Sequence, residues 1–127
     1  MEGVEVERPL KLYFIPYLAS GHMIPLFDIA TMFESRGQQV TVITTPSNAE
    51  SLTKSLSSDA PSFLRLHTVD FPSQQVGLPE GIESMSSTTD SNVTWRIHRG
   101  AMLLHGPIED FIENDPPDCI ISDSTYP

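Results

Sequence analysis

The sequence contains one cysteine and few basic residues. The single thiol, Cys119, can form neither an internal disulfide nor a multi-cysteine metal site, so a reducing compartment is expected, and its apolar surroundings predict that it is buried. Lys and Arg number 7 against 17 Asp and Glu, and the formal net charge is −10. No basic cluster could neutralise phosphates or bind anionic lipid. The composition therefore argues against nucleic acid and membrane surfaces as partners.

Long apolar runs are also missing. No stretch approaches the length that spans a bilayer, and acidic residues stand near the N-terminus where a signal peptide needs basic ones. We therefore expect no membrane insertion and a cytoplasmic location. Apolar residues nevertheless make up 39% of the 127 residues, which is enough to build one core. The chain is expected to form one domain or part of one.

Short apolar runs alternate with helical patterns. Strands are expected where apolar and β-branched residues dominate, at 10–16, 40–45, 63–69 and 118–122. The patterns between them predict helices from Met23 to Gly37, from a capping box at Ser47 to about Leu56, and from Asp90 or Ser91 onward. Pro107 is expected to kink or restart this last helix. The Ser-rich stretch 84–91 is expected to be a flexible loop. This alternation predicts an α/β fold with a Rossmann-like parallel sheet in the strand order 3-2-1-4.

The ends of the chain suggest how the domain is organised. Residues 1–9 are polar and end in Pro9, so we interpret them as a disordered tail. The last predicted strand has no helix after it to cover the sheet. We therefore interpret residues 10–127 as a partial N-terminal domain of a longer protein.

Two polar residues follow strands that this order makes neighbours. Ligands bind such sheets at the carboxyl ends of the strands. His22 follows the first strand at the start of a helix, where the helix dipole favours the neutral imidazole that a general base needs. Asp123 follows the fourth strand. We predict that the two side chains lie within direct or one-water hydrogen-bonding reach, as base and orienting carboxylate, although both are also ordinary capping residues.

For the other candidate residues, the sequence pattern does not support a chemical role. No GxSxG motif surrounds Ser20, which disfavours nucleophilic hydrolysis. His98 and His105 have no third ligand nearby, so no metal site is predicted and we assign them no role. Trp95 is expected to anchor packing.

Four segments carry a family resemblance: FIPYLASGHMIPLFDIA, VTVITTPSNA, VDFPSQQVGLPEGIES and PPDCIISDSTYP. Through them nearly the whole chain resembles the N-terminal, acceptor-binding portion of plant UDP-dependent glycosyltransferases of family 1. The branch it resembles glucosylates triterpenoid saponins and isoflavonoids in legumes. The family implies a GT-B fold of two Rossmann-like domains with the active site between them, and the resemblance extends only to the first.

The resemblance also implies roles for individual residues. His22 matches the family's general base and Asp123 the carboxylate that supports it, while Ser20 and Gly21 lie where the loop approaches the sugar nucleotide. The implied reaction is direct displacement at the anomeric carbon of a UDP-sugar, expected to be UDP-glucose, with inversion and without a metal or other cofactor. The full-length protein is expected to be a monomer. The chain alone is expected to be inactive, because the nucleotide-sugar domain is not matched.

Two other classes of protein stay open. A non-catalytic module could bind a small apolar molecule with the same fold. A dinucleotide-dependent oxidoreductase shares the strand and helix pattern, but the turn YLASGH holds one glycine where that class needs the GxGxxG set.

Overall fold

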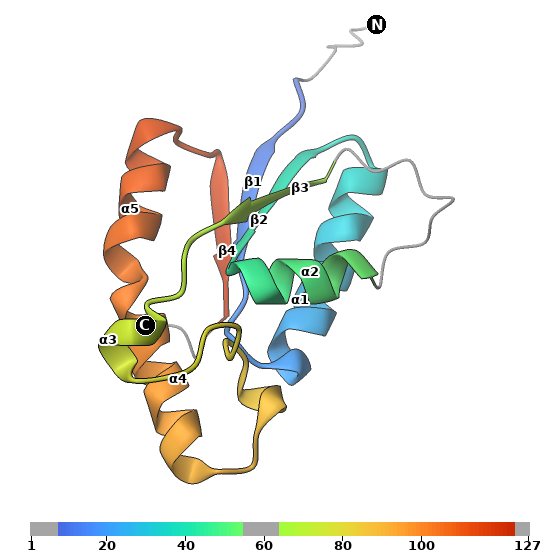
Figure 1. Ribbon diagram of the computed structural model, residues 1–127. Helices are drawn as coiled ribbons and strands as arrows, with labels where there is room; N and C mark the ends of the chain where they lie inside the picture. Colours follow the sequence, from blue (N-terminus) through green and yellow to red (C-terminus); the bar gives the residue numbers. More distant parts are fainter. Residues whose placement is uncertain (1–7, 55–63, 124–127) are drawn as a thin grey trace, which may run out of the picture.

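One parallel sheet organises the molecule. The structure is a computed structural model that describes residues 8–54 and 64–123. Its strands are β1 (Lys11–Ile15), β2 (Gln39–Thr44), β3 (Arg65–Thr68) and β4 (Cys119–Ser122). They pair in parallel in the order β3-β2-β1-β4 (Figure 1). The predicted α/β class and strand order are confirmed. The tail predicted at 1–9 falls mostly on residues 1–7, which lie outside the described residues.

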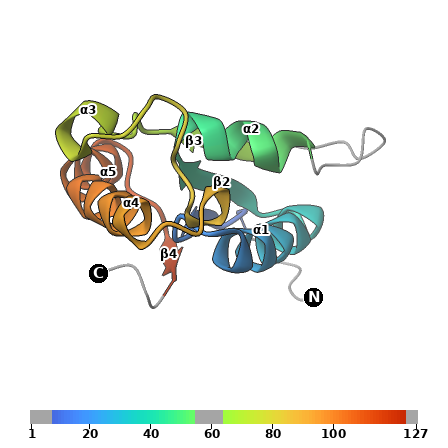
Figure 2. The ribbon, with the colours of Figure 1, turned by 60° about the horizontal axis from the view of Figure 1, so that its bottom comes forward.

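Helices cover both faces of this sheet. They are α1 (Ser20–Ser35), α2 (Pro46–Lys54), α3 (Ser73–Val76), the 3-10 helix η1 (Met85–Ser87), α4 (Ser91–Leu103) and α5 (His105–Asn114). Helices α1 and α2 pack on one face, and α3, α4 and α5 pack on the other, so the sheet is the middle of three layers (Figure 2). This double coverage explains why the two central strands are apolar along most of their length.

The alternation of side chains along β1 divides the core in two. Leu12 and Phe14 face α1, where Phe27 and Ala30 are buried against them. The other side of β1 contributes Tyr13 and Ile15 to a second cluster. This cluster also holds side chains of β2, of the three helices on that face and of the break between α4 and α5: Ile43, Val76, Ile97, Ala101, Leu104 and Ile108. The central strand is therefore fixed from both sides, and its carboxyl end has a defined position.

Helix α1 begins earlier than the sequence pattern predicts. It starts at Ser20 instead of Met23, so His22 belongs to its first turn. The helix ends at Ser35, and Gly37 adopts a φ of 89°, a left-handed conformation that glycine accepts without strain and that turns the chain into β2.

Helix α2 is capped differently from the prediction. It starts at Pro46, and the backbone N–H of Ser47 donates to Glu83 Oε1 at 2.8 Å, so a carboxylate from a distant loop takes the place of the predicted local capping box. Asn48 Nδ2 donates to the Glu83 carbonyl oxygen at 2.9 Å. Residues 55 and 56, the predicted end of this helix, lie outside the described residues.

The loop between β3 and α4 contains short helical segments. It forms α3 and η1, and both Glu83 and Ser84 are buried. The Met85 N–H donates to the Leu18 carbonyl oxygen at 2.9 Å, which attaches the loop to the segment between β1 and α1. The predicted loop at 84–91 therefore contains η1 and is attached to the β1–α1 connection, and its flexibility stays a prediction.

The expected restart of the helix is present: α4 ends at Leu103 and α5 begins at His105, with Pro107 in the first turn of α5, where proline costs no hydrogen bond. Two further expectations need correction. Trp95 is 64% exposed and does not anchor the core. Cys119 is exposed because β4 is an edge of the sheet among the described strands. The predicted cap of α4 by Asp90 is confirmed, since its Oδ1 accepts from the Asn92 N–H at 2.9 Å.

Candidate functional site

The candidate site lies where β1 and β4 end. The register pairs Ile15 with Ser122, and the Asp123 N–H donates to the Ile15 carbonyl oxygen at 3.3 Å. The two neighbouring strands therefore end at the same level. The chain leaves β1 through Pro16 and Tyr17 and enters α1, whose third residue is His22.

His22 and Asp123 meet at this edge. The distance from His22 Nδ1 to Asp123 Oδ2 is 2.6 Å, so the predicted contact is present and is direct. The His22 side chain is 43% exposed, whereas that of Asp123 is 13% exposed. A carboxylate on Nδ1 accepts the proton of that nitrogen and leaves Nε2 as the basic nitrogen of the neutral ring. The geometry thus offers a sheltered carboxylate holding an accessible imidazole.

Ser20 and Gly21 are the first two residues of α1, next to His22 in the chain. The N-cap residue, Ala19, has no side chain that could satisfy the first N–H groups of the helix, and its first turn contains no acidic residue. Gly21 is exposed, and a methyl group at its Cα would meet no atom within 4 Å. Their predicted contact with a sugar nucleotide stays a prediction.

Two residues next to the pair were missed by the sequence reasoning. Tyr17 is 4% exposed, and its ring meets the His22 ring edge-on, with centroids 5.8 Å apart at 80°. Its hydroxyl forms a hydrogen bond with Nδ1 of His98 on α4. Burial, and next the charge of Asp123, raise the pKa of Tyr17 above its usual 10.0. Nothing in the sequence relates Tyr17 to His98, because only the packing of α4 on the sheet brings them together.

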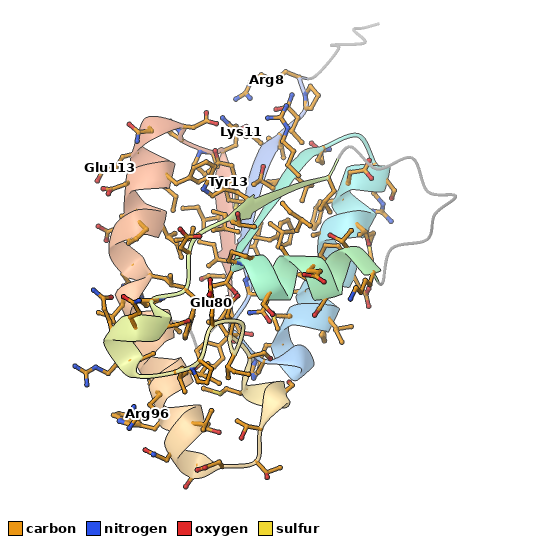
Figure 3. The ribbon with its side chains drawn as sticks, viewed as in Figure 1. Arg8, Lys11, Tyr13, Glu80, Arg96 and Glu113 are labelled. Atoms are coloured by element: carbon orange, nitrogen blue, oxygen red, sulfur yellow. The ribbon has the colours of Figure 1, made fainter. Side chains whose placement is uncertain are left out.

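A group of charged side chains holds the other end of β4. Arg8 donates to both carboxylate oxygens of Asp118, at 2.7 and 2.9 Å, and the Lys11 N–H donates to the same carboxylate at 2.8 Å. Figure 3 shows Arg8 and Lys11 together at the amino end of β1. The hydrogen bond from Arg8, and then that from the Lys11 backbone, lower the pKa of Asp118 to about 2. These contacts fix β4 beside β1 and so fix the position of Asp123.

The lowered pKa of Asp118 gives a pH-dependent prediction. A carboxylate whose pKa is about 2 in the folded chain, against an ordinary 3.8, stabilises the fold fully above 3.8, and this contribution is lost as the pH falls toward 2. We expect Asp118→Asn to lower Tm at neutral pH. The difference in Tm from the wild type should shrink as the pH falls through that window.

Thermal unfolding followed by circular dichroism across this pH range measures the effect. Asp110→Asn, on an exposed position of α5, is the matched control and should shift Tm little at any pH. A difference between wild type and Asp118→Asn that stays constant down to pH 2 would contradict the assigned role of this carboxylate.

A groove lies at the opposite end of the sheet. It has a volume of about 860 Å³ and is lined by residues at the amino ends of β1, β2 and β3 and at the carboxyl ends of α1 and α5, among them Lys11, Glu34, Arg65, His67 and Asp115. It contains neither His22 nor Asp123. Parallel sheets of this kind bind ligands at their carboxyl ends. We therefore place the candidate site at the His22–Asp123 edge and not in this groove.

Over residues 8–54 and 64–123, no helix combines the length and the apolar character needed to cross a bilayer. The same ranges contain no group of three His, Cys, Asp or Glu side chains placed to hold a metal ion. His98 and His105 lie on separate helices.

Fold and site together define a Rossmann-like domain that presents a histidine–carboxylate pair at the carboxyl edge of its sheet. No protein-family model matches the chain. The chain does match individual curated proteins. UDP-glucosyl transferase 73CC6 of Saponaria officinalis is 43% identical over 122 residues, which are 96% of this chain and 24% of that protein. Solanidine UDP-glucose glucosyltransferase 1 of Solanum tuberosum is 42% identical over 121 residues, 93% of this chain and 25% of that protein.

Solved structures agree with these relatives. UGT73P12 of Glycyrrhiza uralensis, complexed with glycyrrhetinic acid 3-O-monoglucuronide, superimposes with a TM-score of 0.83 at 33% identity and covers 93% of this chain and 24% of that one. UGT89C1 of Arabidopsis thaliana, complexed with UDP-L-rhamnose, gives a TM-score of 0.74 at 29% identity over 94% of this chain and 32% of that one.

The chain is therefore homologous to plant UDP-glycosyltransferases. It spans about a quarter of the length of the curated relatives that it matches. The expected fold class, a Rossmann-like parallel sheet that is part of a GT-B fold, is confirmed by the solved structures. The names of these relatives and the UDP-L-rhamnose in one solved structure indicate UDP-sugar donors for those proteins.

Proposed function

We propose that this chain is the acceptor-binding part of an inverting UDP-sugar-dependent glycosyltransferase. The observation that carries the proposal is the 2.6 Å contact between His22 Nδ1 and Asp123 Oδ2 at the carboxyl edge of the sheet. It holds the His22 ring through Nδ1, while the His22 side chain is 43% exposed to solvent. The homology to UDP-glycosyltransferases supports the same class of reaction.

In this proposal His22 is the general base. Its Nε2 takes the proton of the acceptor hydroxyl, and the acceptor oxygen forms a bond to the anomeric carbon of the sugar. The bond from that carbon to UDP breaks, and UDP leaves with the electron pair, so the configuration at the carbon inverts. Asp123 accepts from the Nδ1–H of His22 and stabilises the imidazolium that forms. Neither a metal nor a covalent sugar–protein intermediate is required.

The proposed donor is UDP-glucose and the proposed acceptor is a triterpenoid or isoflavonoid alcohol, with the triterpenoid favoured. The named substrate of one relative is solanidine, and one solved structure holds glycyrrhetinic acid 3-O-monoglucuronide, both large fused-ring molecules. Ser20 and Gly21, at the N-terminus of α1, are proposed to contact the sugar nucleotide, since the N–H groups of a first helical turn favour phosphate oxygens.

The experiment uses a protein of the length of the relatives that contains this chain. It is incubated with UDP-glucose and a panel of triterpenoid, steroidal and isoflavonoid alcohols. The products are separated by liquid chromatography and identified by mass spectrometry. We expect glucosides of alcohols and none from the same acceptors with the hydroxyl methylated. Absence of transfer from any UDP-sugar, together with binding of NAD, would refute the proposal in favour of an oxidoreductase domain.

A further inference from the structure

A line of aromatic rings connects His22 to helix α4. The ring of Tyr17 lies edge-on to His22 at 5.8 Å and is tilted by 56° against His98, with centroids 5.9 Å apart. The indole of Trp95, one helical turn before His98, stacks on the His98 ring at 5.8 Å and 28°. The candidate base is therefore in contact with α4 through the side chain of Tyr17.

The hydroxyl of Tyr17 is the polar connection in this line. A buried hydroxyl is costly without a hydrogen-bond partner, and Nδ1 of His98 supplies one. Because burial raises the pKa of Tyr17, the hydroxyl stays protonated and neutral near neutral pH. It can therefore donate to Nδ1, which places the proton of a neutral His98 ring on Nε2.

We propose that His98 is a positioning residue for His22 and acts through Tyr17. The hydrogen bond to His98 holds the Tyr17 ring, and that ring limits the rotation of the His22 imidazole against which it packs. A fixed ring plane keeps Nδ1 of His22 on Asp123 and presents Nε2 to an acceptor. The inference rests on the proposed function, in which His22 is the base, and adds a residue from α4 to it.

The tautomer of His22 tests the proposal without any transfer reaction. The chain contains four histidines, so labelling them with 15N gives a spectrum in which each ring can be assigned by substitution. Long-range nitrogen–proton spectra, recorded where the histidines are neutral, report the ratio of the Nδ1–H to the Nε2–H form. We expect His22 in the wild-type chain to be mainly Nδ1–H.

Two single variants remove the connection from opposite ends. Tyr17→Phe keeps the ring and loses the hydroxyl, and His98→Phe keeps a ring on α4 and loses Nδ1. We expect each to lower the Nδ1–H to Nε2–H ratio of His22 roughly two- to tenfold, the lower part of the range that coupled neighbours show. The double variant should lower it no further, because both changes break the same hydrogen bond.

A conservative variant separates positioning from a general packing role. His98→Asn places an amide oxygen near the position of Nδ1, where it can accept from Tyr17, so it should restore the ratio that His98→Phe loses. Met102→Gln, also on α4 and 40% exposed, is the matched control and should leave the ratio unchanged. An unchanged His22 tautomer in His98→Phe, or failure of His98→Asn to restore the ratio, overturns the proposal. Since His98 is partly exposed, this pair decides the question even if Tyr17→Phe does not fold.

The tautomer measurement also keeps this inference apart from the proposed function. In a protein of the relatives' length, His98→Phe should lower kcat with little change in the KM of the acceptor. Full turnover by His22→Ala would refute the base assignment and leave the tautomer result standing. Conversely, a His22 tautomer ratio that is unchanged in His98→Phe would refute the positioning role and leave the base assignment standing.

Discussion

Replacing His22 by alanine in a protein of the relatives' length should lower glucosyl transfer about 10²- to 10⁴-fold, the usual contribution of a general base. The physical reason is that the proton of the acceptor hydroxyl must leave as the sugar bond forms. His22 is the accessible member of the pair, with Nε2 as its basic nitrogen once Asp123 occupies Nδ1. Initial rates with UDP-glucose and a triterpenoid alcohol measure the effect.

Two further variants sharpen this measurement. Asp123→Asn should also lose rate, because an amide can donate to Nδ1 and so hold the imidazole in the wrong tautomer. His67→Gln is the matched control, since His67 lies in β3, stacks on Phe111 of α5 and is not part of the His22 edge. It should keep the wild-type rate. Wild-type turnover by His22→Ala on an alcohol acceptor would show that the base assignment is wrong.

The sequence predicts the sheet better than the loops. Apolar runs such as VTVITT have few alternatives to a buried parallel strand, and the strand order follows from general rules of connection. The capping of α2 could not be predicted in this way. Ser47 and Glu50 have the spacing of a capping box, but Glu83, 36 residues beyond Ser47, takes that position because the loop folds back over the sheet edge.

In the candidate site, too, some contacts could be predicted from the sequence and others could not. The approach of His22 to Asp123 could be predicted, because each follows a strand and the two strands are neighbours in the predicted order. Tyr17 and His98 could not, since their contact depends on where α4 lies on the sheet and on how its side chains turn. The exposure of Cys119 could not be predicted either. Its local sequence is apolar, but it lies on β4, at the edge of the described sheet. Local patterns predict elements, whereas contacts between distant elements require the packed fold.

Replacing Gly100 by alanine should destabilise the chain, although alanine ordinarily favours a helix over glycine by about 1 kcal/mol. Gly100 lies in α4, and a Cβ there would stand 2.3 Å from Cζ and 2.5 Å from Cε1 of Phe71. Phe71 is 8% exposed, so its ring has little room to move away. Overpacking of this kind costs about 1–3 kcal/mol. We expect the free energy of unfolding to fall by up to about 2 kcal/mol net, as measured by urea denaturation.

The matched control is Gly106→Ala in α5, where a Cβ would meet no atom within 4 Å. This variant should be neutral or more stable, by up to about 1 kcal/mol, because only the helix preference remains. The double variant Gly100→Ala with Phe71→Leu then identifies the cause. A smaller side chain at position 71 removes the ring atoms that the new methyl group would meet, so in that background the substitution at Gly100 should cost less than it does alone. Equal costs in both backgrounds would show that the destabilisation does not come from Phe71. A Gly100→Ala chain stabilised as much as the Gly106→Ala chain would contradict the close packing of α4 against this ring.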